Sequence, residues 1–441
     1  MPSNELFPAT SKPFVQGAYA TRALLAHVPQ MSLEERNRRW DRCRKHMLLS
    51  GIDVLVFLGN DLFWGAAMAN MRYMFQIDSV SGAQAVFPIS GDPVVWNGIP
   101  HNQRPTNMYL SLQEWVSDIR CSMGNAEICE ELRARGFERA RIGLVSFSST
   151  LQPPTLLHKD AVEFPRHLPN AEFIDASGLL QSMRLVKSEE EIGMLRKGGK
   201  IARKVIDAMV ETALPGRTEA EVYAEMIRTQ IANGAEPNVF NFFGAGPVEH
   251  PPEELWHLLH GCEQPLAPTV RPLAEGDIVM AEWHTKYGGY RCHTEYTVYV
   301  GANPPLELLK IWDVSVECLE ASKKALVPGR TIAEAVSMIR APVERAGYDF
   351  VELGFHAMGL ASPEFPTVIY KEGYGYDATN GSRIGDFVLE AGMCFGNNID
   401  VHNAAWKPDV GCMLSDFMVV REGGAECLIG TPTELGRSMK N

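Results

Sequence analysis

The sequence of 441 residues lacks the features of several specialised protein classes. Its nine cysteines include no Cys-x-x-Cys pair, which argues against a disulfide framework and against a zinc site built from cysteines. No apolar run approaches the roughly 18 residues of a membrane span, and the first residues lack the charged and then apolar pattern of a signal peptide. These absences favour a cytoplasmic location and no membrane partner.

Positive charge is also scarce in this chain. The formal net charge is −13 at pH 7, and no run of basic residues interrupts it. Nucleic acid needs a basic surface, so it is excluded as the main partner and a small-molecule substrate is favoured. With 45% hydrophobic and 22% charged residues the composition is that of a globular protein, and the length predicts two domains.

The boundary between these domains is expected near residue 185. Residues 1–185 alternate short apolar strands with helical stretches, which predicts a mixed α/β domain. Within it, the aromatic segment 61–73 carries Arg72 and is a candidate recognition loop, although packing is the favoured use for most of its rings. A charged stretch follows, and a new helix is predicted after Ser188, with Glu191 three residues on. Residues 186–441 then form the second domain.

The second domain repeats its own pattern. The segments LPGRT at 214–218 and VPGRT at 327–331 each precede a helix that starts with threonine and has glutamate three residues later. The strands 276–284 and 392–400 can be aligned without a gap, which matches Glu282 with Asn398 and His284 with Asp400. The C-terminal half is therefore predicted to be a duplicated unit.

A polar face is expected on the segment 275–301. Two strand-like runs flank the turn Gly288-Gly289, and side chains two apart in a strand share a face. One face then carries two acids and two imidazoles, which are Glu282, His284, His293 and Glu295. The face of a solvated edge hairpin is the alternative. The duplication favours an enclosed site, because two related hairpins would bring their equivalent faces together.

From Arg184 to Val420 the chain resembles the pita-bread family that includes creatinase, aminopeptidase P, prolidase and methionine aminopeptidase. The resemblance is carried by RLVKSEEEI, GDIV, GYRCHTEYT, GFHAMGL with EFP, and GMCF, all in family order. It implies an α/β (α+β) fold, with an N-terminal mixed α/β domain and a C-terminal pita-bread domain of two pseudo-repeated units around a curved antiparallel sheet. It also implies a homodimer, with Arg72 or a nearby aromatic residue reaching across to the partner.

Metal-dependent members of this family hold two divalent ions with five ligands. The five corresponding positions here are Glu282, His293, His356, Asn398 and Ser415. Only His356 keeps the family identity, and the set supplies one formal negative charge, too little to offset two adjacent dications. The prediction is therefore an enzyme without a cofactor. A single ion held by Glu282, His293 and His356, with His284 as a possible addition, stays open.

The resulting hypothesis is a metal-independent hydrolase that cleaves an amide or amidine C–N bond in a small and possibly cationic substrate, as creatinase does. A histidine would move the proton while glutamates hold and polarise the substrate. The resemblance places one such glutamate at Glu295 and a proton-transfer histidine in the insertion 247–272, where His250, His257 and His260 are candidates and spacing favours His260. The catalytic candidates are Glu282, His293, Glu295, His356 and His260, and the substrate-binding candidates are Arg72, His284, Glu364, Asn398 and Ser415.

Three alternatives remain at this point. A metal-dependent Xaa-Pro dipeptidase or a lyase of the kind that cleaves dimethylsulfoniopropionate would use a rewired mononuclear site. A non-catalytic binding protein on the same fold is the third. Against the last alternative, a decayed site would not be expected to keep two acids and three imidazoles together.

Overall fold

The computed structural model describes residues 29–60, 62, 65–79, 82–97, 114–121, 124–147, 155–237, 241–249, 268–371, 373–377, 381–407 and 409–438. The chain divides into two compact units, Met1–Arg184 and Leu185–Asn441. In the described part of the chain, no helix combines the length and the apolar character needed to cross a lipid bilayer.

The first unit is built on a six-stranded mixed sheet with the order β4-β3-β2-β1-β5-β6. Its strands are β1 (Val54–Gly59), β2 (Ala83–Pro88), β3 (Val94–Asn97), β4 (Ile119–Cys121), β5 (Arg141–Val145) and β6 (Glu172–Asp175). Its helices are α3 (Leu33–Ser50), η1 (Ala66–Met68), α4 (Ala69–Phe75), α6 (Asn125–Ala134), α7 (His158–His167) and α8 (Ser177–Leu185). The central strand β1 is apolar and buried, so the core of this unit lies along it.

The second unit contains two sheets, with the orders β16-β9-β8-β7 and β11-β10-β12-β14-β15, and β13 paired to β12. The strands are β7 (Asn241–Pro247), β8 (Asp277–Tyr287), β9 (Tyr290–Tyr299), β10 (Asp349–Ala357), β11 (Glu364–Val368), β12 (Cys394–His402), β13 (Gly411–Met413), β14 (Phe417–Val419), β15 (Glu426–Cys427) and β16 (Gly436–Arg437). The helices are α9 (Glu189–Thr212), α10 (Glu219–Ala232), α11 (Leu306–Ala325), α12 (Ile332–Ala346) and η2 (Ile384–Asp386).

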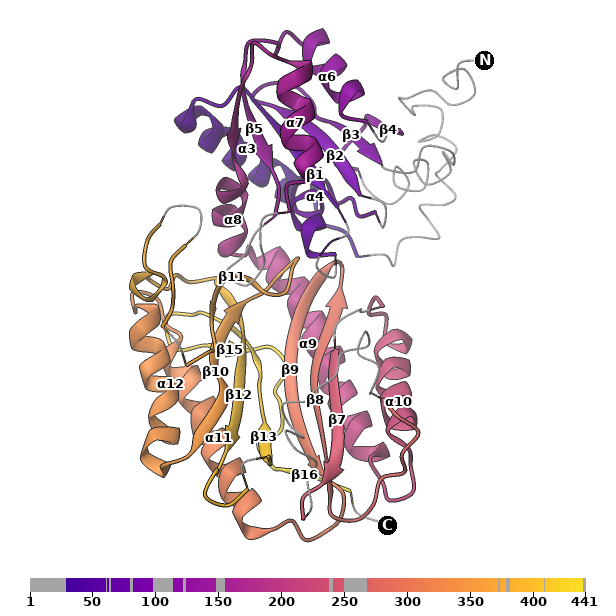
Figure 1. Cartoon of the computed structure of the whole chain (residues 1–441), viewed down its shortest axis with the longest axis vertical. Helices are drawn as coiled ribbons and strands as arrows, with labels where there is room; N and C mark the ends of the chain where they lie inside the picture. The colour runs from indigo at the N-terminus through magenta and orange to yellow at the C-terminus, as the bar shows by residue number, and fades with distance from the viewer. Residues whose placement is uncertain are drawn as a thin grey trace. The chain divides into compact units, whose positions relative to one another are not determined.

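The predicted duplication of this unit is confirmed. Helices α9 and α10 precede β7, β8 and β9, and helices α11 and α12 precede β10, β11 and β12 (Figure 1). The predicted helix starts are also present as capping boxes, with Ser188, Thr218 and Thr331 each bonded to the glutamate three residues later. Reciprocal bonds of this kind satisfy backbone donors that the first helical turn leaves open.

The hairpin of β8 and β9 has the predicted turn. Gly288 and Gly289 both adopt positive φ, 59° and 82°, as a two-residue turn between twisted antiparallel strands requires. The apolar face of the hairpin packs against helix α9. The approach is close at Gly198 of this helix, because a Cβ there would lie only 3.2 Å from Cys292 Sγ. Trp283 on the same face donates to Gln230 Oε1 at 2.6 Å. With this face covered by helices, the polar face is left to line the site.

Candidate functional site

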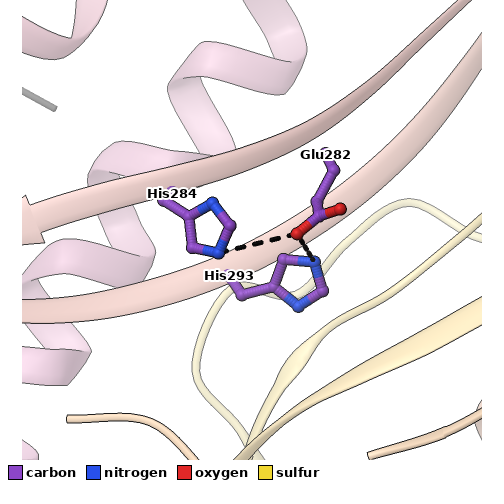
Figure 2. A group of neighbouring side chains, drawn as sticks. All are labelled: Glu282, His284 and His293. Atoms are coloured by element: carbon purple, nitrogen blue, oxygen red, sulfur yellow. Dashed lines mark ion pairs between the residues drawn. The ribbon is translucent and has the colours of Figure 1, made fainter. Parts of the chain in front are cut away.

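Four of the predicted site residues lie on β8 and β9. Glu282 is paired with Glu295, and His284 with His293, so the four side chains share one face as the sequence predicted. Figure 2 shows both imidazoles beside the Glu282 carboxylate, whose Oε1 lies 3.6 Å from His284 Nε2 and 3.5 Å from His293 Nε2. All four side chains are buried. The alternative of a solvated edge hairpin is therefore wrong.

A third imidazole comes from the other sheet. His356 on β10 is opposite Gly396 of β12, and its ring centroid lies 5.1 Å from that of His293. Burial lowers the pKa of both His293 and His356 to about 3. Both rings are therefore neutral at physiological pH, the form in which imidazole binds metals and exchanges hydrogen bonds with a substrate.

Four carboxyl groups, three of them buried and one half-buried, gather beside these rings, and we call them the carboxylate cluster. Its members are Glu282, Glu295, Glu352 and Asp400. Burial raises the pKa of Glu295 to about 8 and that of Glu352 to about 7. Burial and then the neighbouring carboxylates raise the pKa values of Glu282 and Asp400 well above their usual range. Burial therefore favours the protonated forms of these groups, and a bound cation would offset the cost of ionising them.

Glu352 and Asp400 were not among the predicted site residues. The pairing of β10 with β12 shifts between Phe350 and Leu353, so two residues of β10 are accommodated opposite Asp400. Bulges of this kind re-aim side chains next to active sites. The sequence did hold a signal for both residues. Glu352 lies four residues before His356 and Asp400 lies two after Asn398, and even separations along a strand place side chains on the same face.

Asn398 joins the two halves of the cluster. Its Nδ2 donates to Glu295 Oε1 and to Glu352 Oε2, both at 2.8 Å. Ser415 supports Glu295 from behind, because its Oγ accepts the backbone N–H of Glu295 and its own N–H donates to the Glu295 carbonyl at 3.1 Å. Ser415 thus holds the strand that carries the site.

Glu364 lies on β11, where it is opposite Ala357, the residue that follows His356. Its Oε2 forms a buried ion pair with Lys187 Nζ at 3.0 Å, and its Oε1 accepts the backbone N–H of Ala361 at 3.3 Å. These contacts anchor the turn after the His356 strand. The role of Glu364 in orienting His356 or the substrate stays a prediction.

The structure does not test the predicted site roles of two residues. His260 lies outside the described residues. Arg72 belongs to the first unit, on helix α4, and forms an ion pair with Asp78. The end of the segment 61–73 is helical rather than a loop, and Tyr73 is buried, as the alternative that its rings serve packing predicts. Local packing explains this, since Tyr73 hydroxyl donates to the Met183 carbonyl at 3.1 Å.

The position of His293 depends on a glycine of the facing sheet. A Cβ on Gly396 would lie 2.6 Å from His293 Nδ1, closer than van der Waals contact allows. We expect Gly396→Ala to displace this ring and to lower the free energy of unfolding by about 1–3 kcal/mol, as overpacking does. Urea unfolding measures this.

The matched control is Gly423→Ala, because a Cβ there would meet nothing within 4 Å. Equal stability of the two variants would show that the ring has room to move and is not fixed by the glycine.

The ring and carboxylate donors fit a single metal ion. Among the described residues, Glu282, His284 and His293 form a group whose ligand atoms all lie within 4.8 Å of one another. Glu282 Oε1 lies 3.6 Å from His284 Nε2 and 3.5 Å from His293 Nε2. Two ligand atoms on a tetrahedral ion with bonds of about 2.0–2.1 Å lie roughly 3.3 Å apart, so these distances are close to those that one ion requires. Neither ring nitrogen of His293 has a hydrogen-bond partner in the described part of the chain. Ser362 Oγ, 3.2 Å from His284 Nε2, would have to yield to the ion.

The predicted single-ion set was Glu282, His293 and His356 with His284 as a possible addition, whereas the structure groups His284, and not His356, with Glu282 and His293. The reason is geometric, because His284 is the direct cross-strand partner of His293 whereas His356 comes from another sheet. We refer to Glu282, His284 and His293 as the donor triad.

Comparison with known proteins places this site in a family context. The chain is 28% identical over 302 residues to a probable dipeptidase PepE of Mycobacterium tuberculosis, covering 66% of this chain and 72% of that protein. It is 26% identical over 275 residues to an ectoine hydrolase of Halomonas elongata, covering 61% and 64%. The crystal structure of the prolidase from Pyrococcus horikoshii superposes with a TM-score of 0.70 and 20% identity, over 90% of this chain and 99% of that one. The predicted pita-bread fold is confirmed.

A family model described as metallopeptidase family M24 matches residues 193–422, more than half of the chain. With the dipeptidase relative and the donor triad, this match overturns the prediction of a metal-independent hydrolase of non-peptide C–N bonds that needs no cofactor. The error has a physical cause, since the charge count covered only the five family positions and left out Glu295, Glu352 and Asp400. The chain is a hydrolase and belongs to metallopeptidase family M24.

Proposed function

We propose that this protein is a dipeptidase that works with one divalent metal ion held by the donor triad. The observation that carries the proposal is the convergence of Glu282 Oε1 with His284 Nε2 and His293 Nε2, in a chain of metallopeptidase ancestry. Two imidazoles and one carboxylate suit zinc or iron. A bound ion would polarise the scissile carbonyl and make water a stronger nucleophile.

The residues around the triad would position the reactants. Glu295 Oε1 lies 3.5 Å from His293 Nε2, so this carboxylate is placed to accept the proton of a water that attacks beside the triad. The Ile399 backbone N–H, at 3.3 Å from Glu295 Oε2, and the Asn398 amide hold the carboxylate in that orientation. His356 offers a nitrogen, Nδ1, that has no partner in the described structure. It would bond the oxygen of the cleaved peptide group.

The purified protein tests the proposal in two measurements. Metal analysis is expected to find one divalent ion per chain, and a panel of dipeptides such as alanyl-proline is expected to release free amino acids. Ectoine, a cyclic amidine, is the comparison substrate because one relative is an ectoine hydrolase. A fully metal-loaded protein that turns over ectoine and none of the dipeptides would overturn the proposal, and two ions per chain would overturn its metal count.

A further inference from the structure

The β-bulge that carries Glu352 is held by a side chain of helix α12. Arg340 Nε donates at 2.9 Å to the carbonyl of Leu353, the residue where regular pairing with β12 resumes. The Arg340 guanidinium also lies over the ring of Phe350, the last paired residue before the bulge, 4.9 Å from the ring centroid. A guanidinium is planar and keeps its donors in a fixed fork, so one side chain can set the geometry of several groups. Arg340 thus contacts β10 on both sides of Glu352.

Arg340 also fixes the segment that follows β11. Its Nη2 donates at 2.6 Å to the carbonyl of Tyr370, two residues beyond the end of that strand. The Tyr370 hydroxyl in turn donates to the Glu352 carboxylate. One guanidinium therefore fixes the backbone beside both partners of this hydrogen bond, and the position of the Glu352 carboxylate depends on it.

Glu352 completes the hydrogen bonding of Asn398. An amide nitrogen has two hydrogens, and Asn398 Nδ2 donates to Glu352 Oε2 and to Glu295 Oε1, both at 2.8 Å. The Oδ1 atom of the same amide has no hydrogen-bond partner among the residues that the structure describes, so these two bonds set its orientation. If Glu352 moved away, one buried hydrogen of Nδ2 would lack an acceptor, which is unfavourable. The amide would then turn and no longer hold Glu295.

We propose that Arg340 is a positioning residue of this site: by fixing the bulge and the end of β11 it places Glu352 against Asn398, which orients the Glu295 carboxylate. The inference rests on the proposed function, in which Glu295 accepts the proton of the attacking water. Arg340 acts through the backbone of β10 and β11 and needs no contact with the substrate or the metal ion. Its loss should therefore slow the chemical step and leave substrate binding nearly unchanged.

Arg340→Met tests this inference, because it removes the guanidinium and keeps an unbranched apolar side chain. In the crystal structure of the variant, we expect Glu352 to lie beyond hydrogen-bond distance of Asn398 Nδ2, with helix α12 unchanged. In the metal-loaded protein, kcat for alanyl-proline should fall by about 10-fold, the factor that one hydrogen bond of ordinary strength represents, while KM changes by less than about twofold. Should this variant not fold, Arg340→Lys replaces it, since lysine keeps the charge and loses the fork.

A double-mutant cycle shows whether Arg340 acts through Glu352. Glu352→Leu removes the second acceptor of Asn398, so Arg340→Met should lower kcat no further in that background. Glu352→Gln keeps an acceptor oxygen and should lose less turnover than Glu352→Leu. The metal content of these variants should equal that of the wild-type protein. An arginine that only stabilised the fold would give additive losses instead.

The matched control is Arg345→Met on the same helix. Arg345 forms an exposed ion pair with Glu317 at 2.7 Å, and such a pair contributes little to stability, so kcat should not change. An intact hydrogen bond between Asn398 and Glu352 in Arg340→Met, an unchanged kcat, or additive losses in the cycle would each overturn the inference. A wild-type protein that cleaves no dipeptide would remove the proposed function, and the crystal structures would still decide whether Arg340 places Glu352.

Discussion

Replacing Glu282 by glutamine is expected to remove the metal ion and to lower dipeptide turnover by on the order of 1,000-fold, equivalent to about 4 kcal/mol of lost transition-state stabilisation. Glu282 Oε1 is the oxygen that faces both His284 Nε2 and His293 Nε2. A neutral amide of the same shape keeps the packing but offers a dication no charge compensation. Metal analysis and steady-state kinetics of the purified variant measure the two effects.

Glu275→Gln is the control for this variant. Glu275 precedes the same strand and is exposed, so losing its charge should change neither metal content nor turnover. Full metal occupancy and normal turnover in Glu282→Gln would remove this carboxylate from the donor triad and with it the proposed metal site.

Metal removal from the wild-type protein is expected to abolish dipeptide hydrolysis and to lower thermal stability. Neither ring nitrogen of His293 has a hydrogen-bond partner in the described structure, and an ion held by the donor triad would bind one of them. Because an ion binds the folded state, its stabilisation at 100 times its dissociation constant is about 2.7 kcal/mol. Dialysis against a chelator, followed by calorimetry and activity assays, gives both quantities.

Adding individual metal ions back to the metal-free protein shows which metals the site accepts. A triad of two imidazoles and one carboxylate prefers zinc or iron to magnesium or calcium, which bind oxygen ligands. Zinc or iron should therefore restore activity and melting temperature where magnesium and calcium do not. Unchanged activity after complete metal removal would contradict the metal-dependent mechanism.

The hairpin shows how far the sequence alone could lead. Alternation of polar and apolar residues on either side of Gly288-Gly289 predicted both the turn and the common face of Glu282, His284, His293 and Glu295. These relations involve neighbours across a two-residue turn, so the period of two fixes them. The three capping boxes were predictable for the same reason, since each involves residues three apart.

The prediction of a metal-free enzyme failed because it considered only the five family ligand positions. Asn398 and Ser415 are poor metal ligands. In the structure both residues instead form hydrogen bonds that position Glu295. His284 supplies a donor at a position outside the five family ligand positions. Counting the charge of the whole buried face requires knowing which residues lie beside these positions in the folded structure.

The sequence by itself determined the duplicated unit, the hairpin and the polar face on which Glu282, His284, His293 and Glu295 stand, because these depend on short separations along the chain. Only the tertiary structure decided that Glu352 and Asp400 join that face and that His284 rather than His356 completes the donor triad. The pairing of β10 with β12, with its bulge, connects residues about fifty positions apart. No local pattern specifies that register, since it is set by how the two halves of the unit pack together.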